Sequence, residues 1–232
     1  MRVAVVSPVY GNAPTLAALA DRLGAALAGH DWRLRLVVDA SPDDSAAVAA
    51  ALPGPVATTV LAVNGGQHAA LARGLADEPD ADAWVLLDAD LQDPPEAVPA
   101  LLDRLAAGDV AAVFAGRRGA YEGAGRRLTG TAHRRAVRLL TGLPPDAGAF
   151  LALDARARAA VLRAGAPSVV AAIGASRLPV ASVPVRRDAR PVGASAWTSR
   201  ARARQSARTL AWTARARLSA SSAARSGRPS PP

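Results

Sequence analysis

The chain has 232 residues, half of them hydrophobic, and it contains no cysteine. This length suffices for one α/β domain with a full core, while the absence of cysteine excludes a disulfide framework, a thiolate zinc site and a thiol nucleophile. The net charge of +9 is unevenly placed, because residues 186–232 carry eleven arginines and one acid, whereas residues 1–185 carry seventeen arginines and eighteen acids.

The first half of the chain alternates predicted strands and helices. Apolar runs typical of strands occur at 3–6, 34–38, 56–63, 84–87 and 110–115, and helical patterns lie between them at 15–27, 45–52, 67–76 and 95–107. Such alternation with short loops predicts a parallel, doubly wound sheet. Several polar or turn residues follow these strands and would share the carboxyl edge of the sheet, where such folds bind ligands. They are Pro8, Tyr10, Asp39, Asn64, Asp88 and Asp90.

The second half is less regular. Its patterns predict a helix over 125–141, a short strand and a helix over 150–162, a strand over 180–185 and an arginine-rich helix over 193–218. From Ser219 onward, Ser, Ala, Arg and Pro predict a disordered tail. We therefore divide the chain into a domain over 1–196, a basic helical extension over 197–218 and a tail over 219–232.

The most informative stretch is 84–96. An apolar strand runs straight into Asp88 and Asp90, which are followed by Gln92, Asp93 and a double proline. Two carboxylates at a strand end are hard oxygen ligands of the kind that suit Mg²⁺ or Mn²⁺ carrying a diphosphate. An acidic turn stopped by proline has the same local pattern, so the motif needs support from its surroundings.

Three further blocks give that support. They read Ser7-Pro-Val-Tyr-Gly-Asn, Val38-Asp-Ala-Ser-Pro-Asp-Asp-Ser and Asn64-Gly-Gly-Gln-His-Ala-Ala-Leu-Ala-Arg-Gly-Leu. Together with Leu87-Asp-Ala-Asp-Leu-Gln-Asp-Pro-Pro-Glu, they resemble family 2 glycosyltransferases, in the branch of dolichyl-phosphate mannose synthases and bacterial polyprenyl-phosphate glycosyltransferases. The resemblance runs over residues 3–200 and is strongest up to residue 118. It implies the GT-A (Rossmann-like) α/β fold, a mostly parallel sheet flanked by helices, here followed by the arginine-rich helical extension.

The resemblance also implies a nucleotide-sugar pocket. Pro8, Tyr10 and Asp39 would line the nucleoside part, with the Asp39 carboxylate accepting hydrogen bonds from the base or ribose. The alternative for Asp39 is a turn residue that caps a helix.

For the donor diphosphate, the resemblance implies a metal site. Asp88 would meet the ribose or the metal, and Asp90 and Gln92 would hold the divalent cation, Mg²⁺ or Mn²⁺, that bridges the two phosphates. Such a cation neutralises charge on the leaving nucleoside diphosphate.

Basic and acidic residues later in the chain complete the implied site. Arg117 and Arg190 match positions that contact donor or acceptor phosphate, for which the planar guanidinium is well suited. For each, an ordinary solvated surface arginine is the alternative. Asp146 matches an acid beside the acceptor, a candidate base. A lipid phosphate acceptor is mostly ionised at neutral pH, and Asp146 would then only orient groups.

The leading hypothesis is thus an inverting, metal-dependent hexosyltransferase that uses a UDP- or GDP-linked sugar and polyprenyl phosphate. Some residues depart from the family pattern, such as Leu151 where arginine is common and Ala196 where lysine is frequent. These changes on the acceptor side, with the missing membrane spans, motivate one alternative, a soluble glycosyltransferase acting on a hydroxylated small molecule or glycan. Two acids of the family pattern are also lost, one after Tyr10 and one at Val38, and they motivate a second alternative, a catalytically weakened nucleotide-sugar-binding protein.

The sequence has no run of 18 apolar residues, and Pro8 interrupts the opening apolar run. We therefore expect no membrane span and no signal peptide. The basic tail favours a polyanionic surface, and anionic lipid is preferred because no nucleic-acid-binding module is recognised. We expect a cytoplasmic protein, with peripheral binding at the inner face of the cell membrane as a hypothesis.

Overall fold

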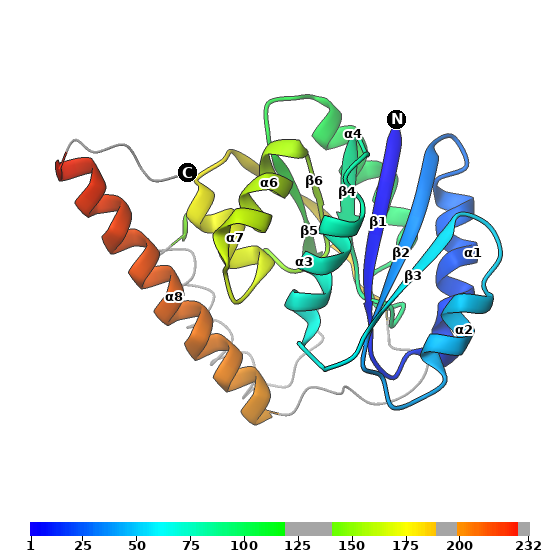
Figure 1. Cartoon of the computed structure of the whole chain (residues 1–232). Coiled ribbons are helices and arrows are strands. Elements are labelled where there is room, and N and C mark those ends of the chain that lie inside the picture. The colour runs from blue at the N-terminus through cyan, green and yellow to red at the C-terminus, as the bar shows by residue number, and fades with distance from the viewer. Residues whose placement is uncertain (119–140, 189–198, 227–232) are drawn as a thin grey trace.

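The structure is a computed structural model that describes residues 1–118, 141–188 and 199–226. Its centre is a seven-stranded sheet with helices on both faces and one long helix along the side (Figure 1). The strands, in spatial order, are β3 (Val56–Leu61), β2 (Asp31–Asp39), β1 (Arg2–Val9), β4 (Ala83–Leu86), β6 (Leu151–Leu153), β5 (Ala112–Arg118) and β7 (Val180–Arg186).

Among the described strands, only β6 runs against its neighbours. Leu151 at its start pairs with Leu86 of β4 on one side and with Phe114 of β5 on the other. All the remaining pairs are parallel, so the sheet is mostly parallel, as predicted. The carboxyl ends of the parallel strands and the amino end of β6 therefore share one edge. This edge is where the candidate site residues converge.

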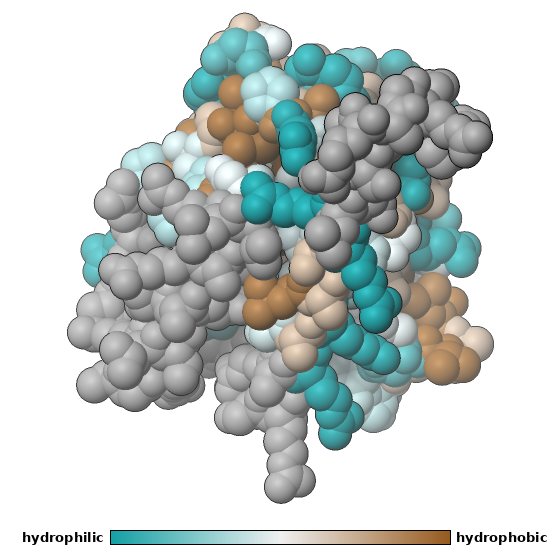
Figure 2. Space-filling model, turned by 90° about the vertical axis from the view of Figure 1, so that its left-hand side faces the viewer, coloured by the Kyte–Doolittle hydropathy of each residue, from teal (hydrophilic) through white to brown (hydrophobic). Residues whose placement is uncertain are grey.

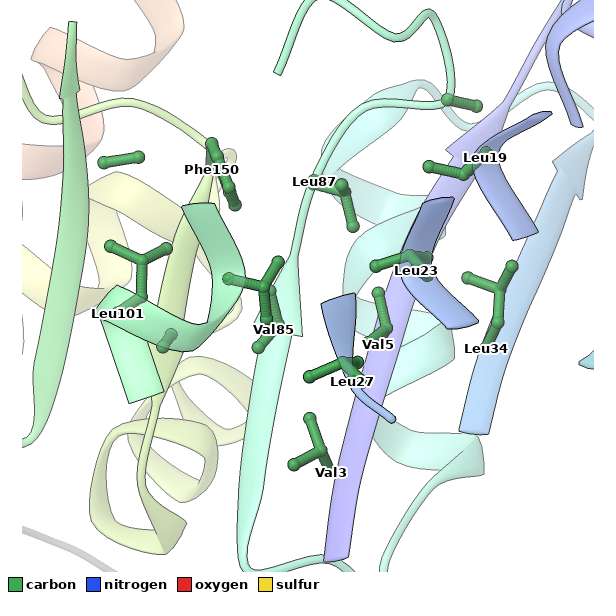
Figure 3. Packing of buried hydrophobic residues seen from close by; sticks show 14 of the residues in the cluster. Val3, Val5, Leu19, Leu23, Leu27, Leu34, Val85, Leu87, Leu101 and Phe150 are labelled. Atoms are coloured by element: carbon green, nitrogen blue, oxygen red, sulfur yellow. The ribbon is translucent and has the colours of Figure 1, made fainter. Parts of the chain in front are cut away.

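Helices cover both faces of the sheet. One face holds α1 (Leu16–Ala26), α2 (Ser45–Ala51) and α4 (Val98–Ala106), and the other holds α3 (Gln67–Asp77), α6 (Ala155–Ala164) and α7 (Val169–Ser176). Short 3-10 turns, η1 (Ala13–Thr15) and η2 (Pro95–Ala97), precede α1 and α4. The leucines of α1 at helical spacing lie over Val3 and Val5 of β1 (Figure 3). Burying one such side chain stabilises the fold by about 1.5–3 kcal/mol.

The strand and helix predictions for the first half are confirmed to within a few residues at most ends. The short strand and helix at 150–162 and the strand at 180–185 are confirmed as well. The sequence patterns did not predict α7. Its start is capped by Ser168, whose hydroxyl accepts a hydrogen bond from the Ala171 amide. The helix predicted at 125–141 falls, apart from Thr141, outside the described residues.

The arginine-rich helix α8 (Ser199–Ser226) lies beside α7 (Figure 1). Gln205 Nε2 of α8 donates a 2.6 Å hydrogen bond to the carbonyl of Pro167, in the loop that precedes α7. Helix α8 continues past Leu218, so 219–226 are helical where disorder was expected. The reason is local: this run of serine, alanine and one arginine contains no glycine or proline before Gly227. Hydrophilic side chains project from its described turns (Figure 2).

Within the described parts of the chain, no single helix is both long and apolar enough to cross a membrane. The pair α6 and α7 passes that criterion only when the two are joined, and they are bent by 110° relative to each other. Both helices supply buried side chains to the core, including Val161 and Ile173.

Candidate active site at the carboxyl edge of the sheet

The centre of the candidate site is Asp88, which follows β4. Gln67, the first residue of α3, donates a 2.6 Å hydrogen bond from Nε2 to Asp88 Oδ1. The other carboxylate oxygen of Asp88 lies 3.7 Å from Arg187 Nη2. Asp88 is therefore held between the start of α3 and the end of β7.

Asp90 and Gln92 continue the same turn. The buried Asp90 carboxylate accepts a 3.0 Å hydrogen bond from the Gln92 amide, which folds the loop back on itself. Between them Leu91 has a φ of 59°, in the left-handed region that non-glycine residues rarely adopt. Such a backbone costs on the order of 1 kcal/mol and clusters at functional sites. The strain accompanies a tight turn that brings Asp88, Asp90 and Gln92 to the same sheet edge.

Asp39, at the end of β2, is almost fully buried and does something the sequence did not predict. Its two carboxylate oxygens accept 2.7 Å hydrogen bonds from the amides of Gly65 and Gly66. These glycines lead directly into α3, so Asp39 fixes the turn that presents Gln67 to Asp88. Asp39 is therefore a turn residue, as in the alternative, but neither α2 nor α3 has a side-chain cap. The predicted role of Asp39 toward a base or ribose stays a prediction.

Pro8 and Tyr10 stand at the end of β1, next to this turn. Pro8 pairs with Val37 of β2, and Tyr10 is exposed, as a residue that meets a ligand must be. The segment after Tyr10 is anchored by Asp43, which accepts from the Ala13 amide and from the hydroxyls of Ser41 and Ser45. Desolvation raises the pKa of Asp43, but these hydrogen bonds outweigh it and lower that pKa to about 2. A charged Asp43 thus braces the β1 and β2 loops.

Asp146 lies just before β6, so it belongs to the same edge of the sheet. Its Oδ2 accepts a 3.2 Å hydrogen bond from Ser182 Oγ of β7, and it packs over Gly116 of β5. A side chain at 116 would meet both Asp146 and Ser182, so glycine leaves the room that Asp146 occupies. The acid is positioned on the β5–β7 half of the edge, while Asp39 and Asp88 stand on the β2–β4 half.

The two arginines predicted to contact phosphate are placed less fully. Arg117 lies in β5 opposite Val185, and its side chain is outside the described part. Arg190 falls within 189–198, also outside the described residues. Both stay predictions.

The residues present fit a divalent cation. Carboxylates of Asp88 and Asp90 and the amide oxygen of Gln92 are hard ligands, and they sit in one strained turn. Across the described ranges, no group of three or more acidic or imidazole side chains forms a ready-made cage. Mg²⁺ commonly binds to one or two carboxylates and completes its shell with substrate phosphates and water.

Sequence reasoning missed three residues of the site. Gln67 belongs to the block that begins at Asn64, but an amide side chain alone indicates no role, and only folding brings it next to Asp88. Asp93 and Arg187 form an ion pair, with 3.0 Å between Arg187 Nε and Asp93 Oδ1 across a sequence separation of 94 residues. No local signal marks such a pair, although Asp93 belongs to the most informative stretch.

Comparison with known proteins agrees with this geometry. Residues 4–156 match the family described as Glycosyl transferase family 2. The match covers more than half of the chain, and the chain therefore belongs to glycosyl transferase family 2.

Curated proteins are similar to part of the chain. The undecaprenyl-phosphate 4-deoxy-4-formamido-L-arabinose transferase of Pseudomonas fluorescens (strain Pf0-1) is 36% identical over 148 residues, which are 61% of this chain and 43% of the relative. The protein of the same name from Sodalis glossinidius (strain morsitans) is 42% identical over 108 residues, 44% of this chain and 33% of the relative. The matched part spans less than half the length of these relatives.

Solved structures share the fold. Mannosyl-3-phosphoglycerate synthase from Rubrobacter xylanophilus superposes with a TM-score of 0.65 at 20% identity, covering 96% of this chain and 75% of that one. Glucosyl-3-phosphoglycerate synthase from Mycobacterium tuberculosis, in complex with Mn²⁺, UDP and phosphoglyceric acid, gives 0.66 at 19% identity, covering 98% and 79%. The predicted GT-A fold is confirmed.

Proposed function

We propose that this chain is an inverting, metal-dependent glycosyltransferase that moves a hexose from a UDP- or GDP-linked sugar to polyprenyl phosphate. The observation that carries the proposal is the turn after β4, where Asp88 and Asp90 stand at the ligand-binding edge and Gln67 holds Asp88 at 2.6 Å. The names of the curated relatives, undecaprenyl-phosphate sugar transferases, support the acceptor. The solved neighbour with Mn²⁺ and UDP supports the donor class.

On the donor side, the chain's residues bind and orient the nucleotide sugar. Asp88, Asp90 and Gln92 would hold the divalent cation, and Arg117 and Arg190 would contact phosphate. When bound, the cation neutralises the negative charge that builds on the leaving diphosphate. Asp39 contributes by fixing the Gly65–Gly66 turn, and so the position of the other donor residues.

On the acceptor side, attack by a lipid phosphate requires no general base from the protein. A phosphate monoester with its second pKa near 6 is mostly ionised at neutral pH, so its oxygen attacks without a proton acceptor. Asp146 then orients groups, held by the hydroxyl of Ser182. A hydroxyl acceptor would require Asp146 to accept a proton.

A second candidate is a glycosyltransferase acting on a hydroxylated small molecule. Both solved neighbours described above are named as sugar-3-phosphoglycerate synthases, and each is covered over three quarters of its length or more. Product analysis separates the two candidates. Polyprenyl phosphate and hydroxylated sugar or glycerate acceptors are supplied in turn with the same donor, and the glycosylated product identifies the class.

Helix α8 suggests how the chain would reach a lipid acceptor. Arg204, Arg208 and Arg215 are exposed along one side of the helix, while Thr213 on the other side is buried. A basic row of this kind attracts anionic lipid, with about 1 kcal/mol for each arginine near the surface. The proposal is peripheral docking through this row.

Vesicle flotation tests the docking. The full chain should float with vesicles containing anionic lipid and stay behind with neutral ones, and the double change Arg204→Glu with Arg208→Glu should abolish flotation. Arg163→Glu, an exposed arginine of α6, is the matched control. Equal flotation of all proteins would rule out α8 as the docking element.

The donor proposal is tested by thermal shift with a panel of nucleotide sugars in Mg²⁺ or Mn²⁺. A stabilising shift that requires both the metal and one nucleotide supports it and identifies base and sugar together. The Asp90→Ala variant should lose the shift. A panel without any metal-dependent shift would contradict the proposal.

A further inference from the structure

Arg187 stands between two carboxylates of the loop that follows β4. It is the first residue after β7, and its Nε donates a 3.0 Å hydrogen bond to Asp93 Oδ1. Its Nη2 lies 3.7 Å from Asp88 Oδ2, within ion-pair range but too far for a hydrogen bond. The side chain is 20% exposed, so it is largely sheltered yet still reached by solvent.

Asp93 holds Arg187 in place. Its side chain is only 4% exposed, and among the described residues its Oδ2 has no hydrogen-bond partner. A buried carboxylate is costly unless a counter-ion pairs with it, and Arg187 supplies that charge. The backbone reinforces the pair, because the Asp188 amide donates a 2.8 Å hydrogen bond to the Gln92 carbonyl. The guanidinium is thus fixed beside the metal-binding turn before any ligand arrives.

The ion pair with Asp93 uses few of the hydrogen-bond donors of Arg187. A guanidinium has five N–H groups, and within the described structure only Nε–H makes a hydrogen bond. Nη2 lies on the side of Asp88, where the donor diphosphate is proposed to bind. Phosphate is the ligand that matches such a planar, forked donor.

We propose that Arg187 binds the diphosphate of the nucleotide sugar directly, with Asp93 as its positioning residue. This inference rests on the proposed donor function and assigns that function a residue outside the predicted set of Arg117 and Arg190. The Nη groups donate hydrogen bonds to the diphosphate, while Nε keeps its hydrogen bond to Asp93.

The position of Arg187 has a second consequence. Its positive charge next to Asp88 opposes the binding of a divalent cation alone, since both compete for the same carboxylate. The negative charge of the diphosphate favours both cations at once. The arginine therefore weakens binding of metal alone and strengthens binding of metal with diphosphate.

These opposite effects on the affinity for metal alone and for metal with diphosphate distinguish direct binding of the diphosphate from a purely structural role of Arg187. If Arg187 only held the end of β7 to the loop after β4, its loss would make that loop less ordered. The affinities for metal alone, nucleoside and diphosphate would then all fall. A diphosphate-binding arginine changes them in different directions.

The test measures three ligands on the full chain: UDP or GDP with Mn²⁺, the matching nucleoside with Mn²⁺, and Mn²⁺ alone by electron paramagnetic resonance. Loss of a charged hydrogen bond predicts that Arg187→Ala weakens diphosphate binding by roughly 10- to 100-fold. Nucleoside binding should change by less than about twofold, and Mn²⁺ alone should bind about threefold tighter as a cation is removed from Asp88. The exposed neighbour Arg186→Ala should match the wild type.

A second variant guards against misfolding. Arg187→Lys keeps a charge for Asp93 but loses the fork, so it should fold and still lose several-fold in diphosphate affinity, with Mn²⁺ alone unchanged. Diphosphate binding equal to wild type in both variants would overturn the inference, as would a parallel loss for all three ligands. If the wild-type chain itself binds neither diphosphate with Mn²⁺, the donor proposal falls along with this one.

Discussion

Gln67 Nε2 donates a 2.6 Å hydrogen bond to Asp88 Oδ1, so the first residue of α3 orients the carboxylate that ends β4. Gln67→Ala should therefore lower the affinity for a metal-bound nucleoside diphosphate by several-fold, because the Asp88 carboxylate is no longer oriented. The free energy of unfolding should fall as well, by up to about 1.5–3 kcal/mol, since a hydrogen bond to a charged group is lost. Calorimetric titration with UDP or GDP and Mn²⁺ measures the effect.

The matched control for that change is Gln205→Ala. Gln205 also donates a 2.6 Å hydrogen bond from Nε2, but to the Pro167 carbonyl beside α8. It should leave the affinity as in the wild type. Equal affinities for both variants would remove Gln67 from the site.

Asp39 gives a prediction about stability. Asp39→Ala leaves the amides of Gly65 and Gly66 without their 2.7 Å acceptors, so the free energy of unfolding should fall by about 1–3 kcal/mol. Urea unfolding measures it, with Asp103→Ala, an exposed carboxylate of α4, as the control expected to change little. If both variants unfold at the same urea concentration, the turn does not depend on Asp39.

Gly116 is predicted to tolerate no side chain. A Cβ at this position would meet Asp146 and Ser182, so Gly116→Ala should destabilise the protein by about 1–3 kcal/mol and displace Asp146. Gly29→Ala is the control, because a Cβ there meets nothing within 4 Å and its φ is not in the left-handed region. Thermal unfolding compares the two, and an unchanged melting temperature for Gly116→Ala would contradict the packing described.

His68 gives the fold a dependence on pH. Burial lowers its pKa to about 4, and Nδ1 is buried without a hydrogen-bond partner among the described residues. Between the unfolded value near 6.5 and pH 4, the unfolded chain binds a proton that the native state excludes. The His68 contribution to the free energy of unfolding therefore falls as the pH drops through this window, by up to about 3 kcal/mol, and is constant below it. At lower pH the free energy of unfolding falls further, because the pKa of Asp43 is lowered to about 2 in the native state.

Two measurements check this dependence. The NMR titration of the His68 ring should have its midpoint near pH 4. His68→Gln should flatten the stability profile between about pH 6.5 and 5, above the range in which carboxylates such as Asp43 take up protons on unfolding. A midpoint near 6.5 would show that the ring is solvated.

The first half of the fold could be predicted because its signals are local. Apolar residues recur at strand and helix spacing, turn residues separate these runs, and the carboxyl-edge loops follow from the alternation. The helix α7 was missed because its run is apolar on nearly every side, which hides the helical period. The antiparallel direction of β6 depends on which strands flank it, and three residues carry no such information.

In the candidate site, too, residues within one short motif could be predicted, whereas contacts between distant segments could not. Asp88, Asp90 and Gln92 were predicted because a motif within five residues carries them. The contact of Asp39 with the Gly65–Gly66 turn, and the pairing of Arg187 with Asp93, join segments that only folding brings together.

Sugar transfer itself is the decisive test of the proposed metal-dependent glycosyltransferase activity. The full chain is incubated with the nucleotide sugar selected by the thermal-shift panel, undecaprenyl phosphate and Mn²⁺, and the lipid product is analysed by mass spectrometry. We expect a lipid-linked sugar phosphate that disappears with a chelator and falls by at least about a hundredfold in Asp90→Ala, as for loss of a group that stabilises the leaving diphosphate. Transfer that proceeds equally without metal and in Asp90→Ala would contradict the proposed metal-dependent activity.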